Sequence, residues 1–246
     1  MITFFKTTLF IPLYNLLIVL TSLLPGADLG LAIIILTILV KIVIFPLYKT
    51  SVMTQIKMKS IEPKLKELKI KYKDNVQEQS RQTMALYKTE KINPFSGILV
   101  MLIQIPIIIS LFYVFKDSFV VQKELIYSFV PVPASLNTIF LGLVNLTTSH
   151  NYLFAFLTGL TQYWQVSLSL PKREKKAPQD GNQSFGADFA KSMDLQMRYM
   201  MPVLTAVIAF TLPTAIALYW VTSNAFSAIY ELVVIKKIKQ KVELGG

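Results

Sequence analysis

Apolar residues along this chain are gathered into blocks near the length of a bilayer crossing, and are not spaced as in a soluble core. A helix needs about 20 mostly apolar residues to cross the hydrocarbon layer. Five blocks predict membrane-spanning helices, over residues 29–48, 95–115, 151–170, 197–212 and 214–235. The fourth block is short, at 16 residues, and meets the fifth at Pro213, so we expect these two helices to form a tight hairpin.

The N-terminal segment, residues 1–28, is apolar but gives a mixed pattern. It carries one weak charge, Lys6, and Pro12 interrupts it. We expect an interfacial helix over residues 12–24, lying along the outer surface. A signal peptide and a sixth span are the open alternatives, and a span entering from the cytoplasm would leave the remaining topology unchanged.

Composition indicates a membrane protein, and the distribution of charge predicts how the chain is oriented in the membrane. With 53% hydrophobic and 16% charged residues, the 246-residue chain is too apolar for an ordinary soluble domain. Residues 49–94 carry 11 Lys or Arg against 5 Asp or Glu, residues 171–196 carry five basic residues, and residues 236–246 carry four. Residues 116–150 carry only two. Because basic loops stay in the cytoplasm, the first span begins outside and the C-terminal tail, 236–246, is cytoplasmic.

The long cationic segment, residues 49–94, predicts a cytoplasmic helical hairpin. An apolar stripe at helical spacing marks its first helix, at Ile61, Leu65, Leu68 and Tyr72. Pro63 should bend or restart this helix, and Asp74 and Asn75 form the turn before the second. The pair is either a linker drawn to anionic lipid or a docking arm for a partner or nascent chain. Its candidate contact residues are Lys64, Lys66, Lys69 and Tyr72.

Lys41 lies inside an otherwise unbroken apolar run. The run from 29 to 47 holds 14 Leu, Ile, Val or Phe residues, which favour insertion by about 4–8 kcal/mol against about 2.5–3.5 for a central lysine. Lys41 is about 10 Å from Tyr48 along a helix, so its stem either snorkels to the interface or faces a polar cavity. An unpaired cation requires water, which favours a hydrophilic groove open to the cytoplasm. Glu231 is the nearest candidate carboxylate.

The sequence lacks the residues that several classes of function require. There are no cysteines, His150 has no neighbouring metal-type ligand, and neither a nucleophile–base set nor a phosphate-binding glycine loop occurs. We therefore expect no enzyme activity, no metal and no cofactor. Nor is there the aromatic interleaving of a nucleic-acid platform, so we expect no direct DNA binding.

Two blocks of sequence carry a resemblance to a known family. The string MALYK…NPF…LIQIPI and the string LYWVTSN, with Met200, Met201 and Pro202 before the latter, resemble the YidC-type membrane protein insertases. The family includes mitochondrial and chloroplast insertases. The resemblance covers residues 12–240 in order. It implies an all-α polytopic membrane protein, in its short form without a large outer domain, in the plasma membrane of a bacterium.

The resemblance also implies a site and an activity. The family has a positively charged groove residue, usually arginine, in the first core span, and Lys41 occupies that position. Thr37, Gln104 and Trp220 fall on positions along the family's groove or substrate path, and the expected groove set also includes Tyr219 and Asn224. The implied activity is insertion of nascent membrane proteins into lipid without nucleotide hydrolysis. Implied partners are membrane lipids, the ribosome, targeting machinery and the Sec translocon.

Two other functions fit a chain with polar residues inside its spans. A small ion channel or transporter would need them too, although ion-coupling acids and paired broken helices are not evident. A chaperone working beside the Sec translocon would differ from an autonomous insertase only in acting with a partner.

Overall fold

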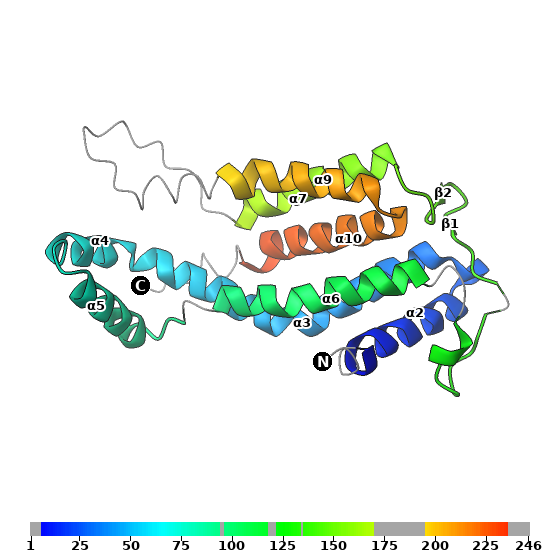
Figure 1. Ribbon diagram of the computed structural model, residues 1–246, viewed down its shortest axis with the longest axis horizontal. Helices are drawn as coiled ribbons and strands as arrows, with labels where there is room; N and C mark the ends of the chain where they lie inside the picture. The colour runs from blue at the N-terminus through cyan, green and yellow to red at the C-terminus, as the bar shows by residue number, and fades with distance from the viewer. Residues whose placement is uncertain (1–5, 94–95, 118–121, 134, 170–194, 236–246) are drawn as a thin grey trace. The chain divides into compact units, whose positions relative to one another are not determined.

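The computed structural model describes residues 6–93, 96–117, 122–133, 135–169 and 195–235, and these are mostly helical (Figure 1). The chain divides into two compact units. One comprises Met1–Lys41 and Ile109–Gly246, and the other is Ile42–Ile108. The boundary between the units crosses α3 (Leu29–Ser60) and α6 (Ser96–Asp117), so each of these helices contributes to both.

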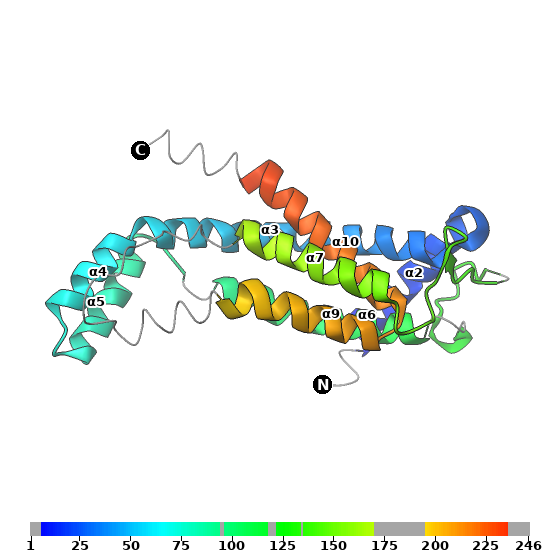
Figure 2. The ribbon, with the colours of Figure 1, turned by 90° about the horizontal axis from the view of Figure 1, so that it is seen from above.

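Three helices of the larger unit pack side by side, α7 (Tyr152–Ser169), α9 (Met201–Thr211) and α10 (Thr214–Tyr230) (Figures 1 and 2). The π-helical turns η4 (Gln196–Met200) and η5 (Glu231–Ile235) precede α9 and follow α10. The predicted tight hairpin at Pro213 is present. Leu212 and Pro213 are both extended, and α10 starts directly afterwards because proline at its N-cap lacks only a donor that the helix does not need.

The predicted first span is part of a longer helix. α3 continues through Pro46, well beyond residue 48, and ends at Ser60. One proline removes one backbone hydrogen bond, and the Thr50 hydroxyl donates to the Pro46 carbonyl one turn later. The chain breaks instead at Ile61, and α4 (Glu62–Lys71) restarts with Pro63 in its first turn, as the sequence predicts.

Length and composition mark two helical stretches of the described chain as long and apolar enough to cross a membrane. They are Lys6–Leu23 and Leu29–Ser51, and Ile105–Phe115 is a shorter apolar stretch. The first comprises the π-helical turn η1 (Lys6–Phe10) and α2 (Ile11–Leu23), where we expect an interfacial helix. A sixth span therefore remains an alternative to that expectation.

Hydrogen bonds from polar side chains hold α2 to the connection that follows α6. The buried Asn15 side chain donates to the Leu125 carbonyl at 2.8 Å and accepts from the Tyr127 amide at 2.7 Å. The Tyr14 hydroxyl accepts from the Gln122 amide at 2.8 Å. Since buried polar groups are costly unless they are paired, these contacts fix where η3 (Lys123–Leu125) lies against α2.

A small β-hairpin in the same connection departs from the all-α expectation. β1 (Ile139–Phe140) and β2 (Val144–Asn145) pair antiparallel around a turn with Gly142 at positive φ. The short alternation of residue types here is too weak a strand signal to find from sequence. The hairpin closes over the N-terminus of α3, because a Cβ on Gly30 would lie 2.2 Å from the Phe140 ring.

Asp28 joins this hairpin to the start of α3. Its buried carboxylate accepts from the backbone amides of Gly30 and Leu31, at 2.8 and 3.1 Å, and so caps the helix. Its second oxygen accepts from the Leu141 amide at 2.9 Å. The same connection reaches α10, where the Thr148 and Leu146 carbonyls accept from the amides at 214 and 215. Residues 137–148 thus tie the starts of α3 and α10 together.

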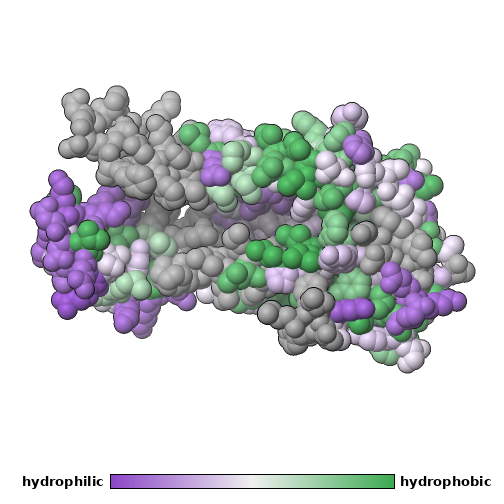
Figure 3. Space-filling view, viewed as in Figure 1, coloured by the Kyte–Doolittle hydropathy of each residue, from purple (hydrophilic) through white to green (hydrophobic). Residues whose placement is uncertain are grey.

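The smaller unit contains two helices of a charged hairpin, α4 and α5 (Val76–Thr89), which contact one another. Hydrophilic side chains gather over them (Figure 3). Lys64 pairs with Glu90 across the two helices at 2.6 Å, and Asn75 caps α5 by accepting from the Glu78 amide. Hydrogen bonds from Gln82 and then Arg81 hold the pKa of the Glu78 carboxyl below its usual value.

Asp28→Ala should destabilise the larger unit by about 2–4 kcal/mol, through loss of a helix cap and of a charge-assisted hydrogen bond. The measurement is the thermal midpoint in detergent, together with the rate of proteolysis within residues 122–150. Asp74→Ala, in the exposed turn of the hairpin, is the matched control and should change stability by less than about 0.5 kcal/mol. Equal midpoints for the two variants would contradict the role given to Asp28.

Candidate functional site

The Lys41 ammonium group lies against a hydroxyl of α10. Its Nζ donates to Ser227 Oγ at 3.3 Å, and Ser227 in turn donates to the Ser223 carbonyl at 2.9 Å. Among the described residues, no carboxylate forms an ion pair with Lys41, and Glu231 is not its partner. A neutral acceptor leaves the positive charge uncompensated, so the site retains an attraction for anions.

Thr37 lies one turn before Lys41 on the same helical face. It is fully buried, and its hydroxyl donates to the Ile33 carbonyl at 2.6 Å. This hydrogen bond within the helix satisfies the donor locally. Thr37 therefore lies on the same face of α3 as Lys41, but its hydroxyl proton is already used in the hydrogen bond to Ile33.

Asn224 faces α7. Its Nδ2 donates to Thr161 Oγ1 at 3.4 Å, and the nearby Thr158 hydroxyl donates at 3.5 Å to the Ala217 carbonyl of α10. Asn224 is thus a link between two helices, a role typical of amides in membrane bundles. It lies three residues before Ser227, so one end of α10 carries polar groups toward both α3 and α7.

The remaining expected groove residues differ in how they are held. Tyr219 is 3% exposed, and its ring lies 6.1 Å from that of Phe115 in α6. Trp220 is half-buried. The side chain of Gln104 lies outside the described residues. Lys41, Thr37, Tyr219 and Asn224 therefore all belong to helices of the larger unit. Each of the four contacts different partners, so they do not form one cluster.

Two buried or half-buried serines of the larger unit were missed by sequence reasoning. Ser227, the partner of Lys41, follows Asn224 at helical spacing, and that spacing is the signal that would have found it. Ser110 of α6 is fully buried, and its hydroxyl has no hydrogen-bond partner among the described residues.

The expected hairpin contact residues belong to the smaller unit. Lys64 and Lys66 are engaged in ion pairs with Glu90 and Glu62, both at 2.6 Å. The half-buried Tyr72 ring lies 5.3 Å from the Lys71 ammonium. Lys69 is exposed and makes no ion pair with any described residue. Among the three lysines, its charge is therefore the most available to a partner.

Comparison with known proteins assigns the chain to a family. The profile of the 60Kd inner membrane protein family matches residues 19–241. Proteins named membrane protein insertase YidC, from Haemophilus ducreyi and Clostridium tetani, are 29% and 32% identical over 230 and 217 residues. These alignments cover 94% and 88% of this chain. They cover 37% of the first relative and 86% of the second, so the chain spans about a third of the length of the longer type.

A solved structure shares the fold. The crystal structure of an active YidC insertase with its first transmembrane domain resolved matches with a TM-score of 0.57 and 22% identity, covering 94% of this chain and 47% of that chain. The sequence match and the shared helical fold agree over nearly the same residues. This chain therefore belongs to the 60Kd inner membrane protein family, that of the YidC membrane protein insertases.

Proposed function

We propose that this chain inserts membrane proteins into the lipid bilayer through a hydrophilic groove, without nucleotide hydrolysis. The observation that carries the proposal is the Lys41 ammonium group, which lies in an apolar helix against the neutral hydroxyl of Ser227. Such a charge is costly within lipid and is typical of a functional cavity. The names of the relatives from Haemophilus ducreyi and Clostridium tetani support the same activity.

The proposed architecture is a five-span core, with spans at residues 29–48, 95–115, 151–170, 197–212 and 214–235. The groove lies along α3, α6 and α10, opens to cytoplasm and lipid, and is closed at the outer end by residues 137–148. The start of the first span is outside and the basic tail is cytoplasmic, as the distribution of lysine and arginine indicates. Thr37, Gln104, Tyr219, Trp220 and Asn224 complete the groove set.

Insertion then proceeds in two physical steps. Lys41 attracts the polar, often acidic, segment of an incoming chain, and water in the groove lowers the cost of carrying it part-way across. The apolar segment of the client next moves sideways into lipid. About 20 Leu-like residues favour that transfer by about 6–12 kcal/mol, which is enough to drive insertion without hydrolysis.

The lysine at position 41 restricts how a client is recognised. A point charge on a flexible stem attracts a carboxylate without the two parallel hydrogen bonds that a guanidinium offers. Recognition by Lys41 is therefore a matter of charge more than of geometry. This suits clients that differ in sequence but share an acidic segment.

The hairpin of α4 and α5 is proposed to make the first contact with the nascent chain and its delivery partners. The expected partners are the ribosome, targeting machinery and the Sec translocon. Exposed lysines support this role because they attract anionic partners over about a Debye length. Lys64, Lys66, Lys69 and Tyr72 are its contact residues.

The hydration of the groove can be tested by chemical modification. Because the chain has no cysteine, a thiol at position 41 is the only reactive one. Lys41→Cys should react with a water-soluble maleimide added from the cytoplasmic side, whereas Leu36→Cys, at a fully buried apolar position of α3, should react far more slowly. If the two thiols were equally unreactive, the groove would not be hydrated at Lys41.

The charge of Lys41 can be tested by insertion into proteoliposomes containing this protein alone. Lys41→Glu should lower insertion of a client with an acidic translocated tail about tenfold, equivalent to 1.4 kcal/mol, because like charges repel. Lys41→Arg should retain activity. A client with a neutral tail is the control and should respond little to either variant. Equal insertion of the acidic client by Lys41→Glu would remove the electrostatic part of the proposal.

The hairpin can be tested by comparing two lysines. Lys69→Gln should weaken association with a ribosome–nascent chain complex about twofold to fivefold, the effect of about 0.5–1 kcal/mol from one exposed charge. Lys66→Gln, where Glu62 already balances the charge, should change it less. The difference should shrink as salt is raised. A larger effect from Lys66→Gln would refute the assignment of Lys69 as the available cation.

A further inference from the structure

The turn between β1 and β2 carries a leucine where such turns ordinarily carry a polar residue or glycine. Within residues 140–143 the Leu143 amide donates to the Phe140 carbonyl at 3.0 Å. The two residues between them both have positive φ, 51° at Leu141 and 72° at Gly142. Asparagine, aspartate and glycine are preferred where successive residues take positive φ. Leu141 is therefore held in a backbone conformation that its own side chain disfavours.

Large apolar side chains project from this turn. Leu141 is 59% exposed, Leu143 is 84% exposed, and Ile139, just before the turn, is 45% exposed. Nothing in the described part of the chain lies within 4 Å of a Cβ placed on Gly142. The turn thus has open space around it, and we call Ile139, Leu141 and Leu143 the apolar tip.

Contacts on the inner side of the hairpin fix the position of the apolar tip. The buried Asp28 carboxylate accepts from the Leu141 amide at 2.9 Å. The Phe140 ring lies directly on Gly30, in the first turn of α3. Because the backbone at Leu141 is bound from inside, its exposed side chain is not the result of a loose loop.

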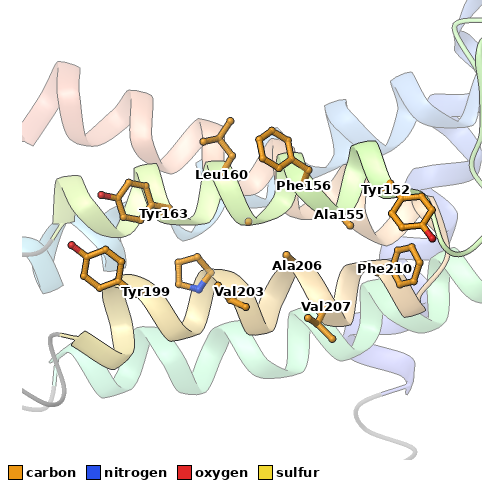
Figure 4. A pocket seen from close by; sticks show the side chains of 12 residues that line it. Tyr152, Ala155, Phe156, Leu160, Tyr163, Tyr199, Val203, Ala206, Val207 and Phe210 are labelled. Atoms are coloured by element: carbon orange, nitrogen blue, oxygen red, sulfur yellow. The ribbon is translucent and has the colours of Figure 1, made fainter.

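The far end of the same connection is fastened to α9. The His150 amide donates to the Phe210 carbonyl at 2.8 Å, and the Phe210 ring lies 4.9 Å from that of His150. The Phe210 ring also lies 4.7 Å from that of Tyr152 at the start of α7 (Figure 4). The hairpin is therefore anchored on both sides, at α3 and at α9.

The hairpin lies at the boundary where α3 would enter a bilayer. The stretch of α3 that is long and apolar enough to span a membrane begins at Leu29. The Leu29 amide donates to the Asn137 carbonyl at 2.9 Å, and the next residue, Gly30, carries the Phe140 ring. The hairpin thus sits beside the first turn of the span (Figure 1), where hydrocarbon would be within reach of the apolar tip.

The sequence around the apolar tip favours lipid over water or a protein partner. Residues 125–150 contain no lysine, arginine, aspartate or glutamate, which are the residues that usually cover a surface in water. Three side chains also offer much less than the roughly 800 Å² that each partner contributes to a standard protein interface. An uncharged surface has no preference for anionic lipid, so its match is the hydrocarbon itself.

We propose that the apolar tip inserts into the lipid leaflet at which α3 begins and anchors residues 137–148 to the membrane surface. Transfer of its side chains from water to hydrocarbon is favourable, and this gain offsets the unfavourable φ of Leu141. Neutral lipid is sufficient because the surrounding sequence is uncharged. The proposal rests on α3 being a membrane span, as in the proposed architecture, and does not depend on insertion activity.

The test is quenching of a fluorescent label by brominated phosphatidylcholine, with the purified full chain in phosphatidylcholine liposomes. Because the chain has no cysteine, Leu143→Cys accepts a single label. Bromines near the top of the acyl chains should quench this label more strongly than bromines near the chain ends. Leu39→Cys, at an exposed position in the middle of the first span, should show the reverse order. Lys123→Cys, exposed in the same connection, should be quenched by neither.

Leu141→Asn separates contact with lipid from folding. Asparagine tolerates positive φ, so this variant should keep or raise the thermal midpoint in detergent. It should nevertheless reduce the quenching of a label at position 143 by about half or more, because the apolar tip loses one of its three apolar side chains. Undiminished quenching in Leu141→Asn would refute the role of Leu141.

The remaining outcomes distinguish failure of the apolar tip from failure of the membrane span. Quenching at Leu39→Cys without quenching at Leu143→Cys would overturn the proposal and leave α3 as a span. A label at position 143 with blue-shifted emission that brominated lipid does not quench would show that protein covers the tip, either a second copy or another segment, and would overturn it too. Absence of quenching at both positions would refute the proposed architecture and the apolar tip together.

Discussion

A single ammonium group within an apolar helix is the constraint on which the proposed function of the larger unit depends. Lys41 could be neutralised by a carboxylate, yet its contact is the Ser227 hydroxyl at 3.3 Å. The hydroxyl supplies an acceptor without cancelling the charge, so Lys41 is held in place and still attracts anions. The helix tolerates it because fourteen Leu, Ile, Val or Phe side chains surround it in sequence.

The segment formed by residues 137–148 complements this site. Asp28 caps α3 and accepts from Leu141 with the same carboxylate, and the Thr148 carbonyl accepts from the Thr214 amide at the start of α10. The two helices that carry Lys41 and Ser227 are therefore tied at their N-terminal ends by hydrogen bonds to this segment. Such ties are strong where water is scarce.

Different kinds of surface in the same chain suit different solvents. The α4–α5 hairpin presents charges that are partly balanced by its own acids, as at Lys64 and Lys66, while Lys69 remains available. The α7–α9 face presents exposed apolar side chains, and the rings of Tyr152 and Phe210 and of Tyr163 and Tyr199 lie close together across it. The first suits an aqueous partner with negative charge, and the second suits hydrocarbon.

The sequence by itself determined the helices and the candidate cation. Blocks of apolar residues predicted where helices lie, Pro213 predicted the tight hairpin, and Lys41 was evident as a charge in an apolar run, because these features depend on local composition and backbone chemistry. Only the tertiary structure decided what each polar residue contacts. Ser227 as the partner of Lys41, Asn224 as a link to α7, and Asp28 as the anchor of an unforeseen β-hairpin all join residues far apart in the chain. Such pairings depend on how helices pack, which single-chain periodicity does not specify.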